Sequence, residues 1–286
     1  NDLKKIDFLI VEVGGTVGDI ESLPFLEAIR QLRNEMSKNQ TIFIHLTLVP
    51  YLNAADELKT KPTQHSVKEL RGIGIQPDLL ICRCEKKITN TDKEKMALFC
   101  NINARNIIQA LDVTNIYELP LVLNKENLDE RVLYNLNIKK YKKANLKKWS
   151  KISNLQKNPQ NSVNIGIIGK YIELKDAYKS LVEALIHSGI NKNIKTNINW
   201  IDASKLVNLK SNIEKLDGII VPGGFGSRGI KGKMYSITYA RKNNIPYLGI
   251  CFGMQLAVIE IAKSVLKITN ASSSEFNKKK SKNVIG

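Results

Sequence analysis

The sequence predicts an α/β fold of two domains, each built on a mainly parallel sheet with helices on both faces. Short apolar runs alternate with segments of helical periodicity along the 286 residues. Glycine-rich turns follow several of these runs directly, as is typical of the ends of parallel strands. A polar, lysine-rich stretch interrupts the alternation near the middle, and the chain is long enough for two hydrophobic cores.

The first half opens on the apolar run at residues 6–13, which predicts a buried strand with Glu12 near its carboxyl end. Gly14 and Gly15 form a turn after it. The elements that we expect next are a helix at 23–36, a strand at 41–49, a short helix at 66–72, a strand at 78–82 and a helix at 92–101.

The composition changes near residue 140, where lysine and asparagine replace the apolar runs. We therefore predict a first domain at 1–140, a connection at 141–162 and a second domain at 163–286. The expected elements of the second domain are a strand at 163–168, a helix at 176–188, strands at 196–201 and 218–221, a helix at 235–243, a strand at 247–250 and a helix directly after it.

The charge and the cysteines exclude several classes of protein. The formal net charge is +17, but only 8 of the 44 basic residues are arginine and the lysines are scattered, so we expect no nucleic-acid partner. No apolar run approaches the ~18 residues of a membrane span, and no signal-peptide pattern is present, so we expect no membrane partner. The four cysteines show no disulfide framework, which favours a cytoplasmic protein.

The most informative motif is Gly249-Ile250-Cys251-Phe252-Gly253, which joins an apolar strand to a helix. The two glycines permit the sharp turn of a nucleophile elbow, which would expose the thiol above the helix N-terminus. Backbone N–H groups at that terminus could stabilise an oxyanion. The alternative is a cysteine buried on a core strand. The motif by itself leaves both open.

A second glycine cluster, at residues 222–229, follows the strand predicted at 218–221. Such a cluster lets the backbone approach a ligand and present N–H groups to an anion. Since it ends a neighbouring strand, we expect it to face the same cleft as Cys251. The alternative is an ordinary glycine-rich turn. Gly232-Lys233 is not the end of a Walker A loop, because Ser227 and Met234 depart from that motif.

These two motifs together resemble the class I (triad) glutamine amidotransferases. The segments at 11–25, 59–67 and 169–180 resemble the CTP synthase family, and the likeness weakens only at 124–162 and over the last ten residues. The resemblance implies a P-loop/Rossmann-like amidoligase part followed by a class I glutaminase part. It also implies a ligase that uses ATP to phosphorylate the 4-oxygen of UTP and aminates it to CTP with ammonia from L-glutamine. Further implications are Mg²⁺ as cofactor, GTP as allosteric activator, CTP as feedback inhibitor, and a homotetramer that shares nucleotide sites between subunits.

Carried over to the second domain, the resemblance makes Cys251 the nucleophile that forms a glutamyl thioester. The oxyanion would be held by Gly224 and by the amide of Phe252, which stands where the family usually has leucine. The residues that the family pattern assigns to glutamine binding are Gly224, Phe252, Gly253, Met254, Gln255 and Glu275.

In the first domain, Glu12 has the position of a carboxylate that holds Mg²⁺ beside nucleotide phosphates, the alternative being a structural acid. Lys59 and Lys61 flank a threonine before Pro62, as in a rigid cationic loop that suits a triphosphate, the alternative being a solvated loop. By resemblance, the UTP- or CTP-binding residues are Asp19, Ile20, Glu21, Lys59, Thr60, Lys61, Pro62, Thr63, Gln64 and Lys95. The ATP-binding residues are Arg83, Leu111, Asp112 and Val113.

The family pattern also contains parts that this sequence does not show. These are an upstream phosphate loop with a lysine, a second acidic metal ligand, and a downstream histidine and glutamate for the triad; His45, His65 and His187 do not fit that histidine. We therefore expect a fragment that lacks both ends and makes no CTP by itself. The alternative is a non-catalytic, nucleotide-binding or oligomer-forming remnant of a broken gene.

Overall fold

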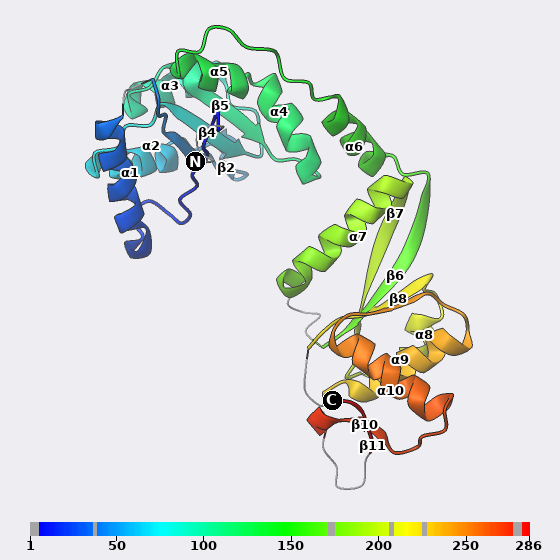
Figure 1. The fold of residues 1–286 in the computed structure, drawn as a ribbon. Helices are drawn as coiled ribbons and strands as arrows, with labels where there is room; N and C mark the ends of the chain where they lie inside the picture. Colours follow the sequence, from blue (N-terminus) through cyan, green and yellow to red (C-terminus); the bar gives the residue numbers. More distant parts are fainter. Residues whose placement is uncertain (1–5, 37–38, 171–174, 206–208, 225–227, 277–281) are drawn as a thin grey trace. The chain divides into compact units, whose positions relative to one another are not determined.

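The computed structural model describes residues 6–36, 39–170, 175–205, 209–224, 228–276 and 282–286. The chain divides into two compact units, Asn1–Ser153 and Asn154–Gly286, and each is considered by itself (Figure 1). The division falls inside the predicted connection at 141–162. Within the described residues, no helix combines the length and the apolar character that a bilayer span requires.

The sheet of the first unit has three parallel strands in the order β1-β4-β5. Their bounds are Ile44–Leu48 for β1, Leu79–Cys84 for β4 and Ile107–Leu111 for β5. The short strands β2 (Tyr51–Leu52) and β3 (Glu57–Leu58) pair antiparallel directly after β1. Because β1, β4 and β5 run in the same direction, the segments that follow them meet at one edge of the sheet.

Helices follow the strands of this unit in the predicted alternation. They are η2 (Ile20–Ser22), α1 (Leu23–Glu35), α2 (Lys61–Gly72), α3 (Asn90–Cys100), η3 (Ala104–Asn106), η4 (Ile116–Glu118), α4 (Leu119–Lys125), α5 (Leu128–Asn135) and α6 (Lys147–Lys157). Thr89 caps α3, since its Oγ1 accepts a hydrogen bond of 3.1 Å from the backbone N–H of Asp92. One buried face of β4 packs against α2 and α3 through Cys82, Val67 and Met96.

The strand predicted at residues 6–13 is wrong. The segment pairs with no strand among the described residues. Its apolar side chains are exposed, Ile10 by 92%, except for Val13, which is half-buried against the cluster of Leu26, Leu70 and Ile75. A strand requires a neighbouring backbone to accept its hydrogen bonds, and apolar character alone does not supply one. On the edge strand β1, Ile44, Leu46 and Leu48 are also exposed, so this part of the sheet is uncovered within the described residues.

The second unit contains a four-stranded parallel sheet in the order β7-β6-β8-β9. Its strands are β6 (Asn161–Gly169), β7 (Ile194–Asp202), β8 (Gly218–Val221) and β9 (Tyr247–Gly249), and β10 (Ala271–Ser273) pairs with β11 (Lys282–Ile285). The helices are η5 (Lys175–Tyr178), α7 (Lys179–Lys192), α8 (Leu209–Ile213), α9 (Ile230–Lys242), α10 (Phe252–Ser264) and η6 (Ser274–Phe276). All strands and helices that the sequence predicts for this unit are confirmed, and the α/β fold class with them.

The core of this unit lies between the sheet and helices α9 and α10. Val221, Ile237 and Phe252 are among its buried residues. Glu260 of α10 is 1% exposed and accepts hydrogen bonds from Arg241 of α9, including one of 2.9 Å. Burial would raise the pKa of the Glu260 carboxyl, but hydrogen bonds from Arg241, Ser264 and Thr238 outweigh it and hold the pKa below its ordinary value.

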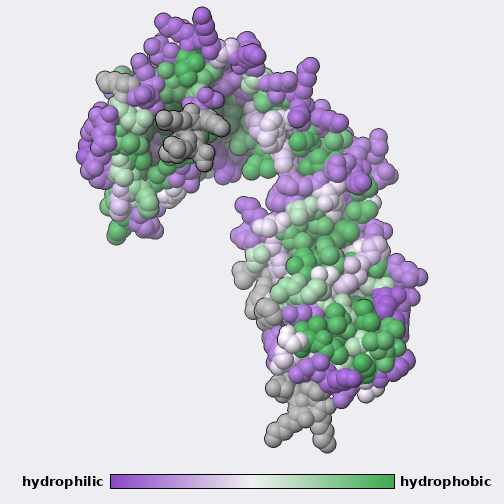
Figure 2. All heavy atoms as spheres, viewed as in Figure 1, coloured by the Kyte–Doolittle hydropathy of each residue, from purple (hydrophilic) through white to green (hydrophobic). Residues whose placement is uncertain are grey.

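The outer face of α10 is apolar. Figure 2 shows hydrophobic residues gathered on the surface where α9 and α10 lie in Figure 1. Val258, Ile261 and Val265 follow one another at helical spacing and are 39%, 45% and 52% exposed. Helix α10 therefore presents one apolar face to the core and another to the surface.

Candidate functional site

Cys251 occupies a strained turn between β9 and α10. Its φ is 51° and its ψ is −109°, a conformation that residues with a side chain rarely adopt. The N–H of Ile250 donates to the carbonyl of Val221 at 3.0 Å, so β8 holds the strand until the residue before the turn. The Cys251 side chain is exposed. The nucleophile elbow is therefore present, and the alternative of a cysteine buried on a core strand is wrong.

The two glycines of the motif are required because neighbouring backbone fills the space of a side chain. A Cβ at Gly249 would lie 2.5 Å from the N of Met254, and a Cβ at Gly253 would lie 2.0 Å from the carbonyl oxygen of Val221. Helix α10 consequently begins directly against the ends of β8 and β9. The Tyr247 hydroxyl donates to the carbonyl of Gly253 at 2.8 Å and holds the turn in place. Nothing in the sequence pattern indicated this role of Tyr247.

The glycine cluster after β8 lies beside the thiol. A Cβ at Gly223 would be 3.5 Å from the Cβ and 4.0 Å from the Sγ of Cys251. Gly224 has a φ of +116°, which only glycine adopts readily. Residues 225–227 of the cluster lie outside the described residues, as do 171–174 of the segment at 169–180. The predicted convergence of the cluster on Cys251 is confirmed for Gly223.

Four of the residues predicted to bind glutamine form the first turn of α10: Phe252, Gly253, Met254 and Gln255. Phe252 is fully buried, with its ring 5.7 Å from that of Phe276, so only its backbone can serve the site. Met254 is 54% exposed. Glu275 is exposed and belongs to η6, the element that brings Phe276 against Phe252. The structure thus places the element of Glu275 next to the elbow. Gly253 is buried and Gln255 half-buried on the first turn of α10.

A buried lysine behind the elbow was missed by the sequence analysis, which treated Lys233 only as part of a false phosphate loop. Lys233 is fully buried on α9, and its Nζ lies 5.1 Å from the centre of the Phe252 ring. Burial, and then the charge of Lys170, lowers the pKa of Lys233. Its Nζ has no hydrogen-bond partner among the described residues.

His187 does not reach Cys251. It lies on α7, which packs against β7, and is 3.9 Å from Glu183 of the same helix. Cys251 follows β9 at the opposite edge of the sheet. Three strand spacings separate these edges, about 14 Å at ~4.8 Å each. His45 and His65 belong to the first unit, where His45 is 2.8 Å from the Ser66 hydroxyl.

In the first unit, the predicted ATP-binding residues gather at the carboxyl edge of the sheet. Arg83, near the end of β4, donates from Nε to Asp112 Oδ1 at 2.8 Å. The N–H of Asp112 donates to the carbonyl of Cys84 at 3.0 Å, which fixes Leu111 and Val113 beside the end of β4. Lys59 joins the same edge, since its N–H donates to the carbonyl of Pro50 at 2.8 Å.

The predicted cationic loop at residues 59–64 is wrong in part, because α2 begins at Lys61 rather than at Ser66. Pro62 stands in the first turn, where a missing N–H costs nothing. Lys61 and Pro62 are exposed, whereas Thr60 and Thr63 are 4% and 0% exposed. Two side-chain contacts explain this burial: the Thr63 and Thr47 hydroxyls are 2.5 Å apart, and Gln64 donates to Thr60 Oγ1 at 3.1 Å. Lys95 is exposed on α3, and Lys59 pairs with Glu57.

The described residues do not bring Asp19, Ile20 and Glu21 to this edge. Helix α1 and the turn before it pack against Leu70 near the end of α2 and against Phe43 before β1. The length of α2, 12 residues or about 18 Å, lies between them and Lys61. Ile20 and Glu21 are exposed, and the Asp19 carboxylate accepts a hydrogen bond of 2.7 Å from the N–H of Thr16.

Glu12 is exposed on the unpaired segment and does not end a strand. Within the part of the chain that the structure describes, no three His, Cys, Asp or Glu side chains cluster as a metal site. A single carboxylate fits Mg²⁺ where phosphate oxygens complete the coordination. The Glu12 carboxylate is therefore compatible with a Mg²⁺ site to which a bound nucleotide also contributes ligands.

With this geometry established, sequence comparisons identify the relatives of the chain. Residues 1–138 match the family model of the CTP synthase N-terminus, and residues 173–284 match that of class-I glutamine amidotransferases. The chain belongs to the CTP synthase family. It is 55% identical over 281 residues to the CTP synthase of Pelagibacter ubique (strain HTCC1062), covering 98% of this chain and 52% of that protein.

Two further matches were found, one to a curated protein and one to a solved structure. The chain is 54% identical over 282 residues to the CTP synthase of Hydrogenobaculum sp. (strain Y04AAS1), covering 99% of this chain and 52% of the relative. A solved glutaminase domain of Trypanosoma brucei CTPS with bound acivicin is 39% identical, covers 41% of this chain and 47% of its own, and superposes with a TM-score of 0.39. The chain spans about half the length of the CTP synthases that it matches.

The burial of the cysteines gives a prediction about their reactivity. Burial raises the pKa of Cys82 to about 12 and those of Cys84 and Cys100 to about 11, whereas Cys251 is exposed. Because the thiolate is the reactive form, iodoacetamide at pH 8 is expected to label Cys251 alone in the native chain. Peptide mass spectrometry should find all four cysteines labelled in denaturant. Equal native labelling of Cys100 and Cys251 would contradict the burial.

Proposed function

We propose that the chain contributes to both active sites of a CTP synthase. The observation that carries the proposal is Cys251, exposed on a strained elbow with Gly223 against its Sγ. The thiolate would attack the side-chain amide carbon of L-glutamine, ammonia would leave, and water would hydrolyse the resulting glutamyl thioester to glutamate. The N–H of Phe252 and the backbone at Gly224 would stabilise the oxyanion.

The second half of the proposed reaction uses the carboxyl edge of the first unit. ATP would transfer its γ-phosphoryl group to the 4-oxygen of UTP, and ammonia would displace that phosphate to give CTP. Lys59, Lys61 and Arg83 would contact the nucleotide phosphates at this edge, where phosphate oxygens would replace Glu57 and Asp112 as the partners of Lys59 and Arg83. Glu12 would hold Mg²⁺, whose positive charge would stabilise the phosphate groups. Regulation by GTP and CTP and a cytoplasmic location belong to the same proposal.

The proposal includes a homotetramer, and one observation supports it. Asp19, Ile20 and Glu21 are separated from Lys59 and Lys61 by the length of α2. Ile20 and Phe25 on this side of the unit are 82% and 62% exposed. A neighbouring subunit that covers these apolar residues would bring its own Asp19–Glu21 turn to a nucleotide bound at Lys59, and a site would then need two subunits.

The UTP assignment is tested in a chimera, the Pelagibacter ubique CTP synthase with its 281 aligned residues replaced by those of this chain. Replacing Lys59 or Lys61 by Ala is expected to raise the KM for UTP about tenfold, since each removes a charge-assisted contact with phosphate. The kcat should change little if the contact is equally strong in the ground and transition states. Initial rates over a range of UTP concentrations give both constants.

Lys68 provides the matched control, because it is exposed on the same helix and lies outside the predicted segment. Lys68→Ala should leave the KM for UTP within twofold. An unchanged KM in the Lys59 and Lys61 variants would refute their assigned role without affecting the role of Cys251.

A further inference from the structure

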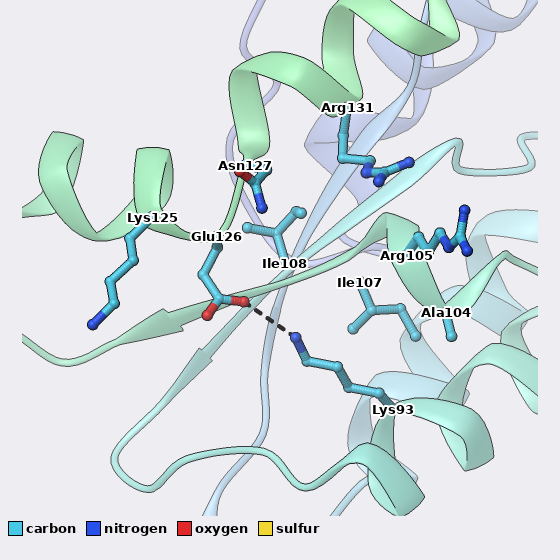
Figure 3. Close-up of a pocket in the computed structure, with 9 residues that line it drawn as sticks. All are labelled: Lys93, Ala104, Arg105, Ile107, Ile108, Lys125, Glu126, Asn127 and Arg131. Atoms are coloured by element: carbon cyan, nitrogen blue, oxygen red, sulfur yellow. Dashed lines mark hydrogen bonds and ion pairs between the residues drawn. The ribbon is translucent and has the colours of Figure 1, made fainter. Parts of the chain in front are cut away.

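The first unit contains a cationic pocket beside the beginning of β5. The pocket has a volume of about 260 Å³ and is lined by Lys93, Ala104, Arg105, Ile107, Ile108, Lys125, Glu126, Asn127 and Arg131 (Figure 3). Ile107 is the first residue of β5, whereas Leu111 ends it. Ile108, the second pocket residue of the strand, is four residues before Asp112, the partner of Arg83. At ~3.3 Å per residue this is about 13 Å along the strand.

The one carboxylate that lines this pocket is already occupied. Glu126 Oε2 accepts from Lys93 Nζ at 3.1 Å and from the backbone N–H of Gln109 at 3.4 Å. Figure 3 shows the Lys93–Glu126 contact as a dashed line. The ion pair neutralises one of the four cations that line the pocket. Arg105, Lys125 and Arg131 remain in excess.

Two of the cations that line the pocket are arginines. Arg105 comes from η3 and Arg131 from α5, so separate elements bring two guanidinium groups to one cavity. Neither Arg105 nor Arg131 forms an ion pair with a carboxylate among the described residues. Lys125 points away from Lys93 and Glu126 in Figure 3. Guanidinium groups bind phosphate-type oxyanions through paired N–H donors. Arg105 is exposed and Arg131 is half-buried, with its guanidinium carbon 5.8 Å from the centre of the Tyr134 ring.

We propose that Arg105 and Arg131 bind a free oxyanion of the size of orthophosphate in this pocket. The pocket, at about 260 Å³, has room for an ion of this size. Asn127 adds a polar group at the start of α5, where its φ of 60° ends the preceding turn. The pocket is independent of the proposed catalysis, because none of its residues belongs to the predicted nucleotide or glutamine sites.

Inorganic phosphate is the probe, titrated calorimetrically into the 286-residue chain at constant ionic strength adjusted with NaCl. Constant ionic strength is needed because a chain with a net charge of +17 attracts every anion. Wild type should bind one phosphate saturably, and R131Q and R105Q should each bind it about tenfold more weakly. The matched control is R71Q, an exposed arginine of α2 outside the pocket, which should change the affinity less than twofold.

Circular dichroism melting of each variant tests whether it is folded. Because Arg105 and Arg131 lie on different elements, misfolding would have to occur in both variants to explain weaker phosphate binding by both. Three outcomes would overturn the proposal. They are no saturable binding to wild type, unchanged affinity in both pocket variants, or an equal loss in R71Q. A fourth concerns the occupant: displacement of phosphate by equimolar AMP in wild type but not in R131Q would assign the pocket to a nucleotide phosphate instead of a free anion.

Discussion

Cys251→Ala in the Pelagibacter chimera is expected to abolish CTP formation from glutamine and to leave formation from added ammonium chloride within about twofold of the parent. The thiolate is the only group in the proposed mechanism that can form the glutamyl thioester, so its loss should cost several orders of magnitude. Ammonia supplied from solution needs no thioester. CTP formation is followed by nucleotide chromatography with each nitrogen source.

Two variants make this result specific. Cys251→Ser keeps the shape of the side chain and should lose the same activity, because a hydroxyl is a much weaker nucleophile than a thiolate. Cys100→Ala removes a buried thiol of the first unit, on α3, and should alter both activities by one common factor. If Cys251→Ala reduced the ammonia-dependent and glutamine-dependent rates equally, Cys251 would be structural.

Gly253→Ala is expected to have the largest effect on stability. The added methyl carbon would lie 2.0 Å from the Val221 carbonyl oxygen and 2.8 Å from its carbon, and a main chain cannot move aside as a flexible side chain can. The start of α10 would have to shift from β8, at a cost of about 3 kcal/mol or more. Urea unfolding of the 286-residue chain, followed by circular dichroism, measures the change in the free energy of unfolding.

The same substitution at Gly72 is the control, because a Cβ there meets nothing within 4 Å. Gly72→Ala should change the free energy of unfolding by less than about 1 kcal/mol and can be stabilising. A loss of similar size in both variants, or a native Cys251 reactivity in Gly253→Ala, would show that the close approach of α10 to β8 is not needed for the elbow.

The elbow was predictable because its determinants are local. Gly249, Cys251 and Gly253 carry the backbone requirements within five residues, and the strands at 218–221 and 247–250 are marked by continuous apolar runs. Strand β5 was not predicted, since Gln109 interrupts its apolar run. The structure explains this residue: Gln109 is 4% exposed, and its side-chain oxygen accepts from the backbone N–H of Ile88 at 2.6 Å. A hydrogen bond between residues 21 positions apart cannot be recognised from the alternation of apolar and polar residues along a single strand.

The failed strand at 6–13 shows the opposite case, in which the local pattern is strong but no described strand pairs with it. Among sites built from separate elements, some can likewise be predicted from the sequence and others cannot. Arg83 and Asp112 could be expected to meet, because parallel strands end at one edge. The pocket of Arg105 and Arg131 could not, since its residues come from a 3₁₀ turn and a later helix whose packing the sequence pattern does not indicate.

The central claim is that Cys251 releases the nitrogen that the first unit transfers to UTP. The most direct test supplies the chimera with UTP, ATP, Mg²⁺ and glutamine labelled with ¹⁵N in its side-chain amide, and measures the mass of the CTP formed. The account predicts CTP that carries ¹⁵N in its 4-amino group, and no such CTP from the Cys251→Ala chimera. Unlabelled CTP, or labelled CTP from the Cys251→Ala chimera, would contradict it.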